Sequence, residues 1–329
     1  MNPKITIIIP VYNAENYLSN TIDSIINQSI GFENLELILI DDNSTDNSWK
    51  IINSYANSYD NIKPFFNKTN HGFPGFSRNI GISNAQGKYI MFADNDDEYD
   101  KDFCKTMFEL IESKDADFAA CCFFETDALT QKKVCPPKGL FTKKEDIIAN
   151  CGCMVWNKIY KSEIAKQISF ITDGLNEDSI FLIEYSLKAD SLASINSYTG
   201  YNHLYRSKSL SLSSVSSTLS QIDSFYILYD LLNPDYLKPD YFNTSIQLTL
   251  ERCILGEGSV KQNREILKKL REFENHIGYS SQISSKPVNI LNNLVLNNHL
   301  LTVSLITRFL RPIANNGFLR KIFRRLNGQ

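Results

Sequence analysis

The chain has 329 residues, of which 43% are hydrophobic and 22% are charged, as expected for a globular protein with a main domain and an appendage. Its net charge of −3 gives no support for a nucleic-acid-binding protein. The charge is uneven, because residues 275–329 contain seven basic residues and no Asp or Glu. Such a basic tail suggests a partner of its own.

The N-terminal part alternates short apolar runs with helical patterns. Five runs rich in β-forming residues predict strands buried on both faces, at residues 5–10, 35–40, 62–66, 88–93 and 117–124. Apolar residues recur at helical spacing between them, over Trp49–Tyr59 and Phe103–Ile111. This order predicts an α/β fold, with a mostly parallel sheet flanked by helices and a ligand site beyond the carboxyl ends of the strands.

A second segment follows, and its elements are less regular. Thr142–Glu145 is a capping-box pattern that predicts a short helix, and another helix is expected to start near Asn176. Residues 192–205 predict a strand, whereas the Ser- and Leu-rich residues 207–221 predict a loop or linker. Later patterns are helical. We therefore expect a first domain at residues 1–215 and a helical C-terminal region at residues 216–329.

The ends of the chain and its cysteines bear on localisation. Met1–Lys4 leads directly into a predicted strand, so we expect no secretory signal. The seven cysteines have no zinc-finger spacing, and we expect reduced, partly buried thiols in a cytoplasmic protein.

Residues 318–326 predict a basic amphipathic helix. Its apolar side chains fall on one face, and Arg320, Lys321, Arg324 and Arg325 fall on the other. Two interpretations remain open. The helix could bind an anionic membrane surface, which would make the protein peripheral on the inner membrane face. It could instead pack on its own domain or on a second copy in a homo-oligomer.

The strongest chemical feature is the acidic run Asp94-Asn95-Asp96-Asp97, which follows an apolar predicted strand. If this run is extended, Asp94 and Asp96 face the same side, and Asp97 faces the other. Carboxylate oxygens are the ligands that Mg²⁺ and Mn²⁺ prefer, and such ions often bridge protein carboxylates and phosphates. Taken alone, the run could equally be a solvated acidic turn.

Two further polar clusters follow predicted strands. Pro10-Val11-Tyr12-Asn13 ends the first strand, and Asp41–Asp46 ends the second. Asp42-Asn43-Ser44 could simply be a turn before a helix, a role compatible with ligand binding. Because parallel strands share one carboxyl edge, we expect the three clusters to converge on a single crevice.

These motifs resemble those of family 2 glycosyltransferases with the GT-A fold. The resemblance covers roughly residues 4–210 and rests on six segments in the expected order: residues 10–15, 41–46, 77–81, 94–97, 156–158 and 176–181. It implies a nucleotide-diphospho-sugar transferase fold. Asn43 stands where glycine is usual, and Ser77 stands where alanine is common.

The resemblance also implies roles for individual residues in donor binding. Pro10 and Tyr12 would shape the nucleobase pocket, and Asp42 would accept a hydrogen bond from the base, usually uracil. Asn70 and Arg78 would reach toward the nucleotide-sugar. Asp94, with Asn95 beside it, would contact the ribose or the metal, and Asp96 would be the main protein ligand of Mn²⁺ or Mg²⁺.

Within the Glu177-Asp178 pair, the resemblance implies that Asp178 is the catalytic base. An expected helix N-terminus favours a carboxylate there, although an acidic pair can also simply open a helix. A base and a metal on opposite sides of the sugar would favour single displacement with inversion.

Three more residues are candidates on chemical grounds. Arg206 could close over the diphosphate, since guanidinium matches phosphate oxygens. His203 could complete the metal shell or have a structural role. Lys158 could face the acceptor or support the fold, and the sequence does not separate these roles.

We therefore expect an inverting, metal-dependent glycosyltransferase that uses a nucleotide-sugar, a UDP-sugar in the first instance, and a glycan or lipid-linked acceptor in cell-surface polysaccharide synthesis. The alternative is a non-catalytic nucleotide-sugar-binding module. A dinucleotide-binding enzyme is disfavoured, because no G-x-G-x-x-G follows the first predicted strand. A sugar nucleotidyltransferase would need a Gly-rich basic loop at the same place.

Overall fold

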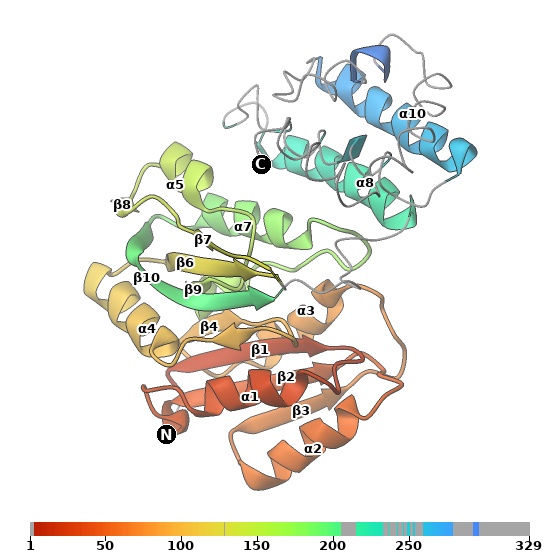
Figure 1. Ribbon diagram of the computed structural model, residues 1–329. Helices are drawn as coiled ribbons and strands as arrows, with labels where there is room; N and C mark the ends of the chain where they lie inside the picture. Colours follow the sequence, from red (N-terminus) through yellow and green to blue (C-terminus); the bar gives the residue numbers. More distant parts are fainter. Residues whose placement is uncertain are drawn as a thin grey trace. The chain divides into compact units, whose positions relative to one another are not determined.

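The computed structural model describes residues 3–127, 129–204, 215–232, 259–278 and 292–295, with single positions 236, 242, 246, 249, 250 and 253. Contacts divide the chain into two compact units, Met1–Ser207 and Lys208–Gln329, which are described separately (Figure 1). Helix α8 begins at Val215, so the end of the predicted linker at residues 207–221 is helical instead. The predicted domain boundary after residue 215 stays a prediction.

The first unit contains one mixed sheet with the strand order β3-β2-β1-β4-β9-β6-β10-β5. The strands are β1 Ile5–Val11, β2 Leu35–Asp41, β3 Ile62–Phe66, β4 Tyr89–Phe92, β5 Glu98–Tyr99, β6 Phe118–Thr126, β7 Gln131–Val134, β8 Gly139–Phe141, β9 Lys158–Lys161 and β10 Leu192–Leu204. Strands β3, β2, β1 and β4 pair in parallel, as predicted. Strand β9 then enters antiparallel between β4 and β6, so the second half of the sheet is mixed.

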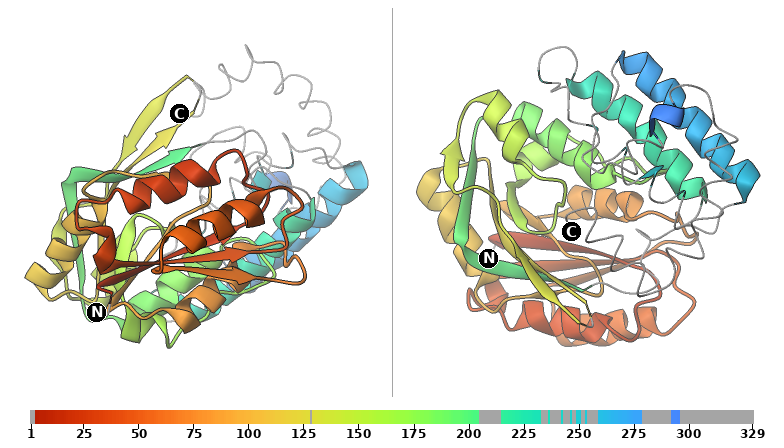
Figure 2. Two further views of the ribbon diagram at one scale, coloured as in Figure 1. Left: turned by 90° about the horizontal axis from the view of Figure 1, so that it is seen from below. Right: turned by 45° about the horizontal axis from the view of Figure 1, so that its top comes forward.

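Helices cover both faces of this sheet. They are α1 Leu18–Ile26, α2 Ser48–Ser58, α3 Pro74–Asn84, α4 Phe103–Lys114, α5 Lys144–Asn150, α6 Ser162–Ala165 and α7 Glu177–Lys188. The odd-numbered residues of β1 join a core with α1, α2 and α4. Phe92 on β4 packs against Phe181 of α7, and Figure 2 shows α1 and α2 on one side of the sheet with α7 on the other.

The sequence pattern misplaced the cap of α5. The N-cap residue is Lys143, and no side chain caps the helix there. A capping box at Thr142–Glu145 would require Thr142 to be the N-cap residue, so that prediction is wrong by one position.

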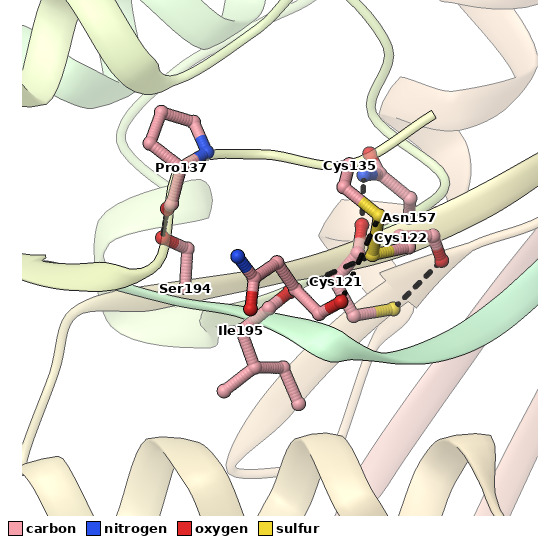
Figure 3. The surroundings of a disulfide bond; sticks show 8 residues. Cys121, Cys122, Cys135, Pro137, Asn157, Ser194 and Ile195 are labelled. Carbon is pink, nitrogen blue, oxygen red and sulfur yellow. Dashed lines mark hydrogen bonds between the residues drawn. A yellow bond between two sulfur atoms is a disulfide. The ribbon is translucent and has the colours of Figure 1, made fainter. Parts of the chain in front are cut away.

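Two of the seven cysteines are oxidised, contrary to expectation. Cys122 on β6 and Cys135, directly after β7, form a disulfide (Figure 3). Cys104, Cys121, Cys151, Cys153 and Cys253 are free thiols. The two cysteines are 13 residues apart in the sequence, a spacing that matches no recognised motif. They meet because β6 and β7 pair in antiparallel orientation.

The described residues of the second unit are mostly helical. Helices α8 Val215–Leu232 and α10 Val260–Ile277 pack through Phe225 and Phe273, whose ring centroids lie 5.5 Å apart. Ser259 and Gln262 form a capping box at the start of α10. The predicted amphipathic segment 318–326 lies outside the described residues. Over the part of the chain that the structure describes, no helix is both long and apolar enough to cross a membrane.

Helix α3 lies close to the sheet because of a glycine. A Cβ atom at Gly81 would stand 2.3 Å from Cγ2 of Ile8 on β1, well inside van der Waals contact. This close approach fixes the height of α3 above the sheet, and α3 carries Arg78 of the predicted site.

We predict that Gly81→Ala lowers the free energy of unfolding by about 1–2 kcal/mol, because overpacking outweighs the higher helix propensity of alanine. Urea denaturation would measure the change. Ser83→Ala, at an exposed position of the same helix, is the control and should stay within about 0.5 kcal/mol of wild type. Equal midpoints for Gly81→Ala and wild type would contradict the close contact.

Candidate active site

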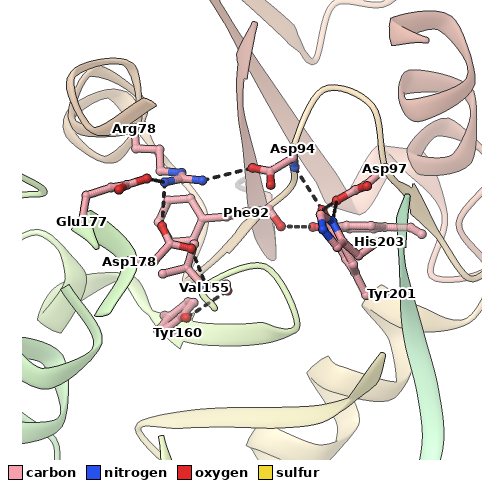
Figure 4. A network of polar contacts seen from close by, with 11 residues as sticks. Arg78, Phe92, Asp94, Asp97, Val155, Tyr160, Glu177, Asp178, Tyr201 and His203 are labelled. Atoms are coloured by element: carbon pink, nitrogen blue, oxygen red, sulfur yellow. Dashed lines mark hydrogen bonds and ion pairs between the residues drawn. The ribbon is translucent and has the colours of Figure 1, made fainter. Parts of the chain in front are cut away.

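Arg78 is the centre of a polar cluster at the carboxyl edge of β4. Its side chain is 3% exposed. Nη1 donates to Asp178 Oδ1 at 2.7 Å and to Glu177 Oε1 at 3.2 Å, and Nη2 donates to Asp94 Oδ1 at 3.0 Å. Figure 4 shows this guanidinium between the turn after β4 and the start of α7. One buried cation therefore joins carboxylates from two distant segments.

The three carboxylates together carry more charge than one guanidinium neutralises. Burial alone would lower the pKa of Arg78, but Asp178, Asp94 and Glu177 raise it. Burial also raises the pKa of the Asp94 carboxyl, against the opposing effect of Arg78. Burial and then the charge of Asp178 raise the pKa of Glu177 to about 7. The cluster therefore favours the addition of positive charge, as protons or as a metal cation.

The acidic run after β4 is a turn, not an extended segment. Asn95 and Asp96 lie in the turn, and Asp97 N donates to Asp94 O at 3.4 Å. The alternation expected for an extended chain therefore does not apply. The turn brings the carboxylates of Asp94 and Asp97 together, so the prediction that Asp97 faces away from the site is wrong.

Asp97 is fully buried and contacts three residues of β10. Its Oδ2 accepts from Tyr201 Oη at 2.7 Å and lies 3.0 Å from His203 Nδ1, and its Oδ1 accepts from Leu204 N at 2.8 Å. Burial alone would lower the pKa of His203, but the hydrogen bond and charge of Asp97 raise it. Trp156 stacks on both rings, with centroid distances of 4.2 Å to Tyr201 and 5.4 Å to His203.

The same residues offer a set of metal-binding atoms. Asp94, Asp97 and His203 each provide one ligand atom, and these atoms lie within 4.8 Å of one another. Since both oxygens of Asp97 already accept hydrogen bonds, we interpret it as the carboxylate that orients His203. Asp96 is partly buried, and its charge raises the pKa of both Asp94 and His203. These oxygen and nitrogen donors fit Mn²⁺ or Mg²⁺, and the ligand role of Asp96 stays a prediction.

The second polar cluster lies at the end of β2. Asp42 is buried, and its Oδ1 accepts from Asn67 Nδ2 and lies 2.8 Å from His71 Nδ1. Its Oδ2 accepts from the backbone N of His71 at 2.8 Å. Each carboxylate oxygen can accept two hydrogen bonds, so a nucleobase at Asp42 would share these bonds or replace them. The strand order β2-β1-β4 places this cluster at the same edge as Asp94.

Two asparagines shape the loops beside Asp42. Asn13 has φ 48° and Asn43 has φ 63°, in the left-handed region that Asn tolerates better than most residues. This explains why asparagine can stand at position 43, where glycine is usual. Asn13 Oδ1 accepts from Thr45 N at 2.8 Å, and Asn13 N donates to Ser44 Oγ at 3.0 Å. The loops after β1 and β2 are therefore joined by reciprocal hydrogen bonds.

The positions of the other predicted site residues say less about their roles. Pro10 is buried in β1, paired with Ile40 of β2, and Tyr12 is 47% exposed just beyond the strand. Asn70 is exposed, and the backbone O of Asn95 accepts from Thr21 Oγ1 at 3.2 Å. Arg206 lies outside the described residues. The predicted roles of these five residues in donor binding stay predictions.

Sequence comparison assigns the chain to a family. The sequence model of glycosyl transferase family 2 matches residues 6–169, about half of the chain. The chain belongs to glycosyl transferase family 2. The inferred family is thus confirmed, and five of the six motif segments lie within the matched residues, whereas residues 176–181 lie beyond them.

Two relatives show how far this similarity extends. A cholesterol galactosyltransferase from Borreliella burgdorferi is 26% identical over 89% of this chain and 91% of its own length. A poly(ribitol-phosphate) β-glucosyltransferase from Bacillus spizizenii is 31% identical over 60% of this chain, but the match covers 32% of that relative. The chain spans about a third of the length of several curated family relatives that it matches.

A solved structure confirms the fold. Residues 1–349 of TarS from S. aureus superpose with a TM-score of 0.69 at 19% identity, over 93% of this chain and 91% of that one. The same fragment in complex with UDP gives a TM-score of 0.67. The predicted GT-A fold of family 2 is therefore confirmed.

Several residues of the cluster around His203 were missed in the sequence analysis. Asp97, Tyr201 and Trp156 were not singled out as members of the site, although they orient His203. Tyr201 and His203 are two residues apart on β10, and this spacing in a predicted strand could have indicated a shared face. His71, the partner of Asp42, had no such signal.

We predict that Glu177→Gln makes the free energy of unfolding less dependent on pH. A carboxyl with a raised pKa in the folded chain contributes stability that is complete below its unfolded pKa of about 4.5 and is lost as the pH rises through about 7. A glutamine side chain at position 177 does not titrate. Its unfolding free energy should therefore gain about 2–3 kcal/mol relative to wild type between pH 4.5 and 7.5.

Denaturant titrations at a series of pH values in EDTA would measure this difference. Glu163→Gln, which changes an exposed acid of α6, is the matched control and should differ from wild type by a constant amount. A flat difference for Glu177→Gln as well would show that Glu177 holds no extra proton in the folded chain.

Proposed function

We propose that this family 2 chain is an active, metal-dependent, inverting glycosyltransferase. It would transfer a sugar from a UDP-sugar to a hydroxyl group of a glycan or lipid-linked acceptor in cell-surface polysaccharide synthesis. The supporting observation is the grouping of Asp94, Glu177 and Asp178 around Arg78, beside the Asp97–His203 pair. The partly buried acidic pair at the start of α7 supports a catalytic chain over a non-catalytic nucleotide-sugar-binding module.

The metal would lie on the β4 side of this cluster. Asp94 and His203 would hold Mn²⁺ or Mg²⁺, with Asp96 as a further ligand and Asp97 orienting the imidazole. When bound, the ion would stabilise the negative charge that develops on the diphosphate leaving group. Arg78 already contacts Asp94, so its guanidinium is in reach of the same region and is suited to phosphate oxygens.

The nucleotide would bind across the ends of β1 and β2. Tyr12 offers an exposed ring, and Asp42 offers carboxylate oxygens that can accept a hydrogen bond from the N–H of uracil. The TarS fragment has been solved with UDP and with UDP-GlcNAc, which supports a UDP-sugar as the first donor to test. The predicted contact of Arg206 with the diphosphate remains part of this proposal.

Asp178 would act as the general base. It lies in the first turn of α7, where the helix dipole stabilises a negative charge. Asp178 Oδ1 accepts from Arg78 and Oδ2 accepts from Val155 N at 3.2 Å, so both oxygens are oriented. The carboxylate would take the proton of the attacking hydroxyl. Attack from the side opposite the diphosphate would invert the anomeric carbon.

The acceptor class is proposed from the relatives. The Bacillus spizizenii relative acts on poly(ribitol-phosphate), and a relative from Bacillus subtilis takes part in minor teichoic acid biosynthesis. Both support a hydroxyl-bearing surface polymer as the acceptor here. The sequence supports three further proposals: a cytoplasmic location, membrane contact through residues 318–326, and a homo-oligomer.

We predict that the purified chain releases UDP from at least one of UDP-glucose, UDP-galactose and UDP-GlcNAc when Mn²⁺ is present. EDTA should reduce the release to background, because the charge of the leaving group is then no longer stabilised. Adding excess Mn²⁺ should restore the rate. Release that is equally fast in EDTA would refute metal dependence, and no release from any donor would refute the proposed donor class.

We predict that Asp178→Asn lowers the rate of sugar transfer or donor hydrolysis by about 100-fold or more, the usual contribution of a general base. Binding of UDP, measured by calorimetry with Mn²⁺, should stay within about threefold of wild type. Asp173→Asn, an exposed acid shortly before α7, is the matched control. Wild-type turnover by Asp178→Asn would move the role elsewhere, with Glu177 as the first alternative.

A further inference from the structure

Lys158, at the start of β9, is a buried lysine that the proposed mechanism does not use. Its side chain is almost completely buried, with 3% of the residue exposed. Within the described part of the chain, no carboxylate forms an ion pair with its Nζ. Removing an ammonium group from water without a charged partner costs free energy, and here burial lowers the pKa of Lys158. Packing alone therefore does not account for a lysine at this position.

The contacts of Lys158 lead to one backbone carbonyl. Nζ donates to Met154 O at 2.6 Å and to Asn157 Oδ1 at 2.8 Å. Asn157 is itself fixed, because its Nδ2 donates to Cys121 O on β6 at 2.7 Å. Lys158 therefore holds Met154 O from a position that is anchored to the sheet.

The carbonyl of Met154 and the N–H of Val155 belong to the same planar peptide group. The N–H end of this group donates to Asp178 Oδ2 at 3.2 Å. The next carbonyl, Val155 O, accepts from Tyr160 Oη at 2.9 Å, and Figure 4 shows both contacts of Val155. In a trans peptide the C=O and N–H point in opposite directions, so a cation at the oxygen fixes the direction of the N–H.

We propose that Lys158 is a positioning residue for Asp178, acting through the Met154–Val155 peptide group. The ammonium group orients this peptide and polarises it, so that its N–H becomes a stronger donor to the carboxylate. The inference rests on the proposed role of Asp178 as the base. The sequence left two roles open for Lys158, contact with the glycan acceptor and support of the fold. The structure favours support of the fold, because the buried Nζ already donates to two protein oxygens.

The first test uses donor hydrolysis by water, with no glycan acceptor present. Lys158→Met should lower the kcat for UDP release from the best donor by about 10- to 100-fold, as is common when a group that orients a functional side chain is removed. UDP binding should stay within about threefold of wild type. Lys161→Met, on the same strand, removes a structural ion pair with Asp117 and is the matched control, with kcat unchanged.

Two results would overturn the proposal. A folded Lys158→Met chain that hydrolyses the donor at the wild-type rate would show that Asp178 does not depend on Lys158. A defect that is seen with a glycan acceptor and is absent with water would make Lys158 an acceptor contact. Lys158→Gln keeps an N–H donor but loses the charge, so its kcat should fall between those of wild type and Lys158→Met.

A second test does not depend on activity. Amide hydrogen exchange of the segment 152–156 should become about tenfold faster in Lys158→Met, or in Lys158→Gln if the first variant does not fold, and should be unchanged in Lys161→Met. Unchanged protection in a folded Lys158 variant would overturn the proposal even if the chain hydrolysed no UDP-sugar. Absence of hydrolysis by wild type, with the expected exchange result, would count against the proposed function alone.

Discussion

The site depends on one guanidinium surrounded by carboxylates. Arg78 contacts Asp94, Glu177 and Asp178, which come from segments about 80 residues apart, and its side chain is 3% exposed. A charge this deeply buried is stable only with partners, and three acids exceed what one arginine can neutralise. The remaining negative charge makes the cluster suited to a cation and to proton transfer, which are the two requirements of the proposed reaction.

Placing this arginine requires agreement between local sequence and packing. Gly81 lets α3 approach Ile8 of β1, and Gly75 lets the same helix approach the backbone of Ile171, where a Cβ would stand 2.0 Å from the carbonyl oxygen. The start of α7 supplies Glu177 and Asp178, and the turn after β4 supplies Asp94. Each carboxylate is thus held at the end of an element rather than on a long loop, which fixes its distance to Arg78.

Much of the fold could be predicted, because strands buried on both faces appear as continuous apolar runs. The run at residues 62–66 matched β3 in full, although β3 is an edge strand with mostly exposed residues and is not buried on both faces as expected. Strands β1 and β2 end one residue later than predicted, and β4 is one residue shorter at each end. Strands β5, β7, β8 and β9 were missed, since segments of two to four residues are too short to give a periodic signal. The Cys122–Cys135 disulfide was also missed, because it depends on the pairing of β6 with β7.

The site was predictable to the level of its motifs but not of its contacts. The sequence indicated Asp94 and the Glu177-Asp178 pair, yet an extended geometry was assumed for a segment that is a turn. Because the segment turns, Asp97 lies on the same side as Asp94, and Asp97 holds His203. Lys158 illustrates the same limit, since its contact with Asp178 passes through the Met154–Val155 peptide group, and a sequence motif does not reveal which way a peptide plane points. The chemistry of such a site is therefore set by backbone groups as much as by the side chains that a motif names.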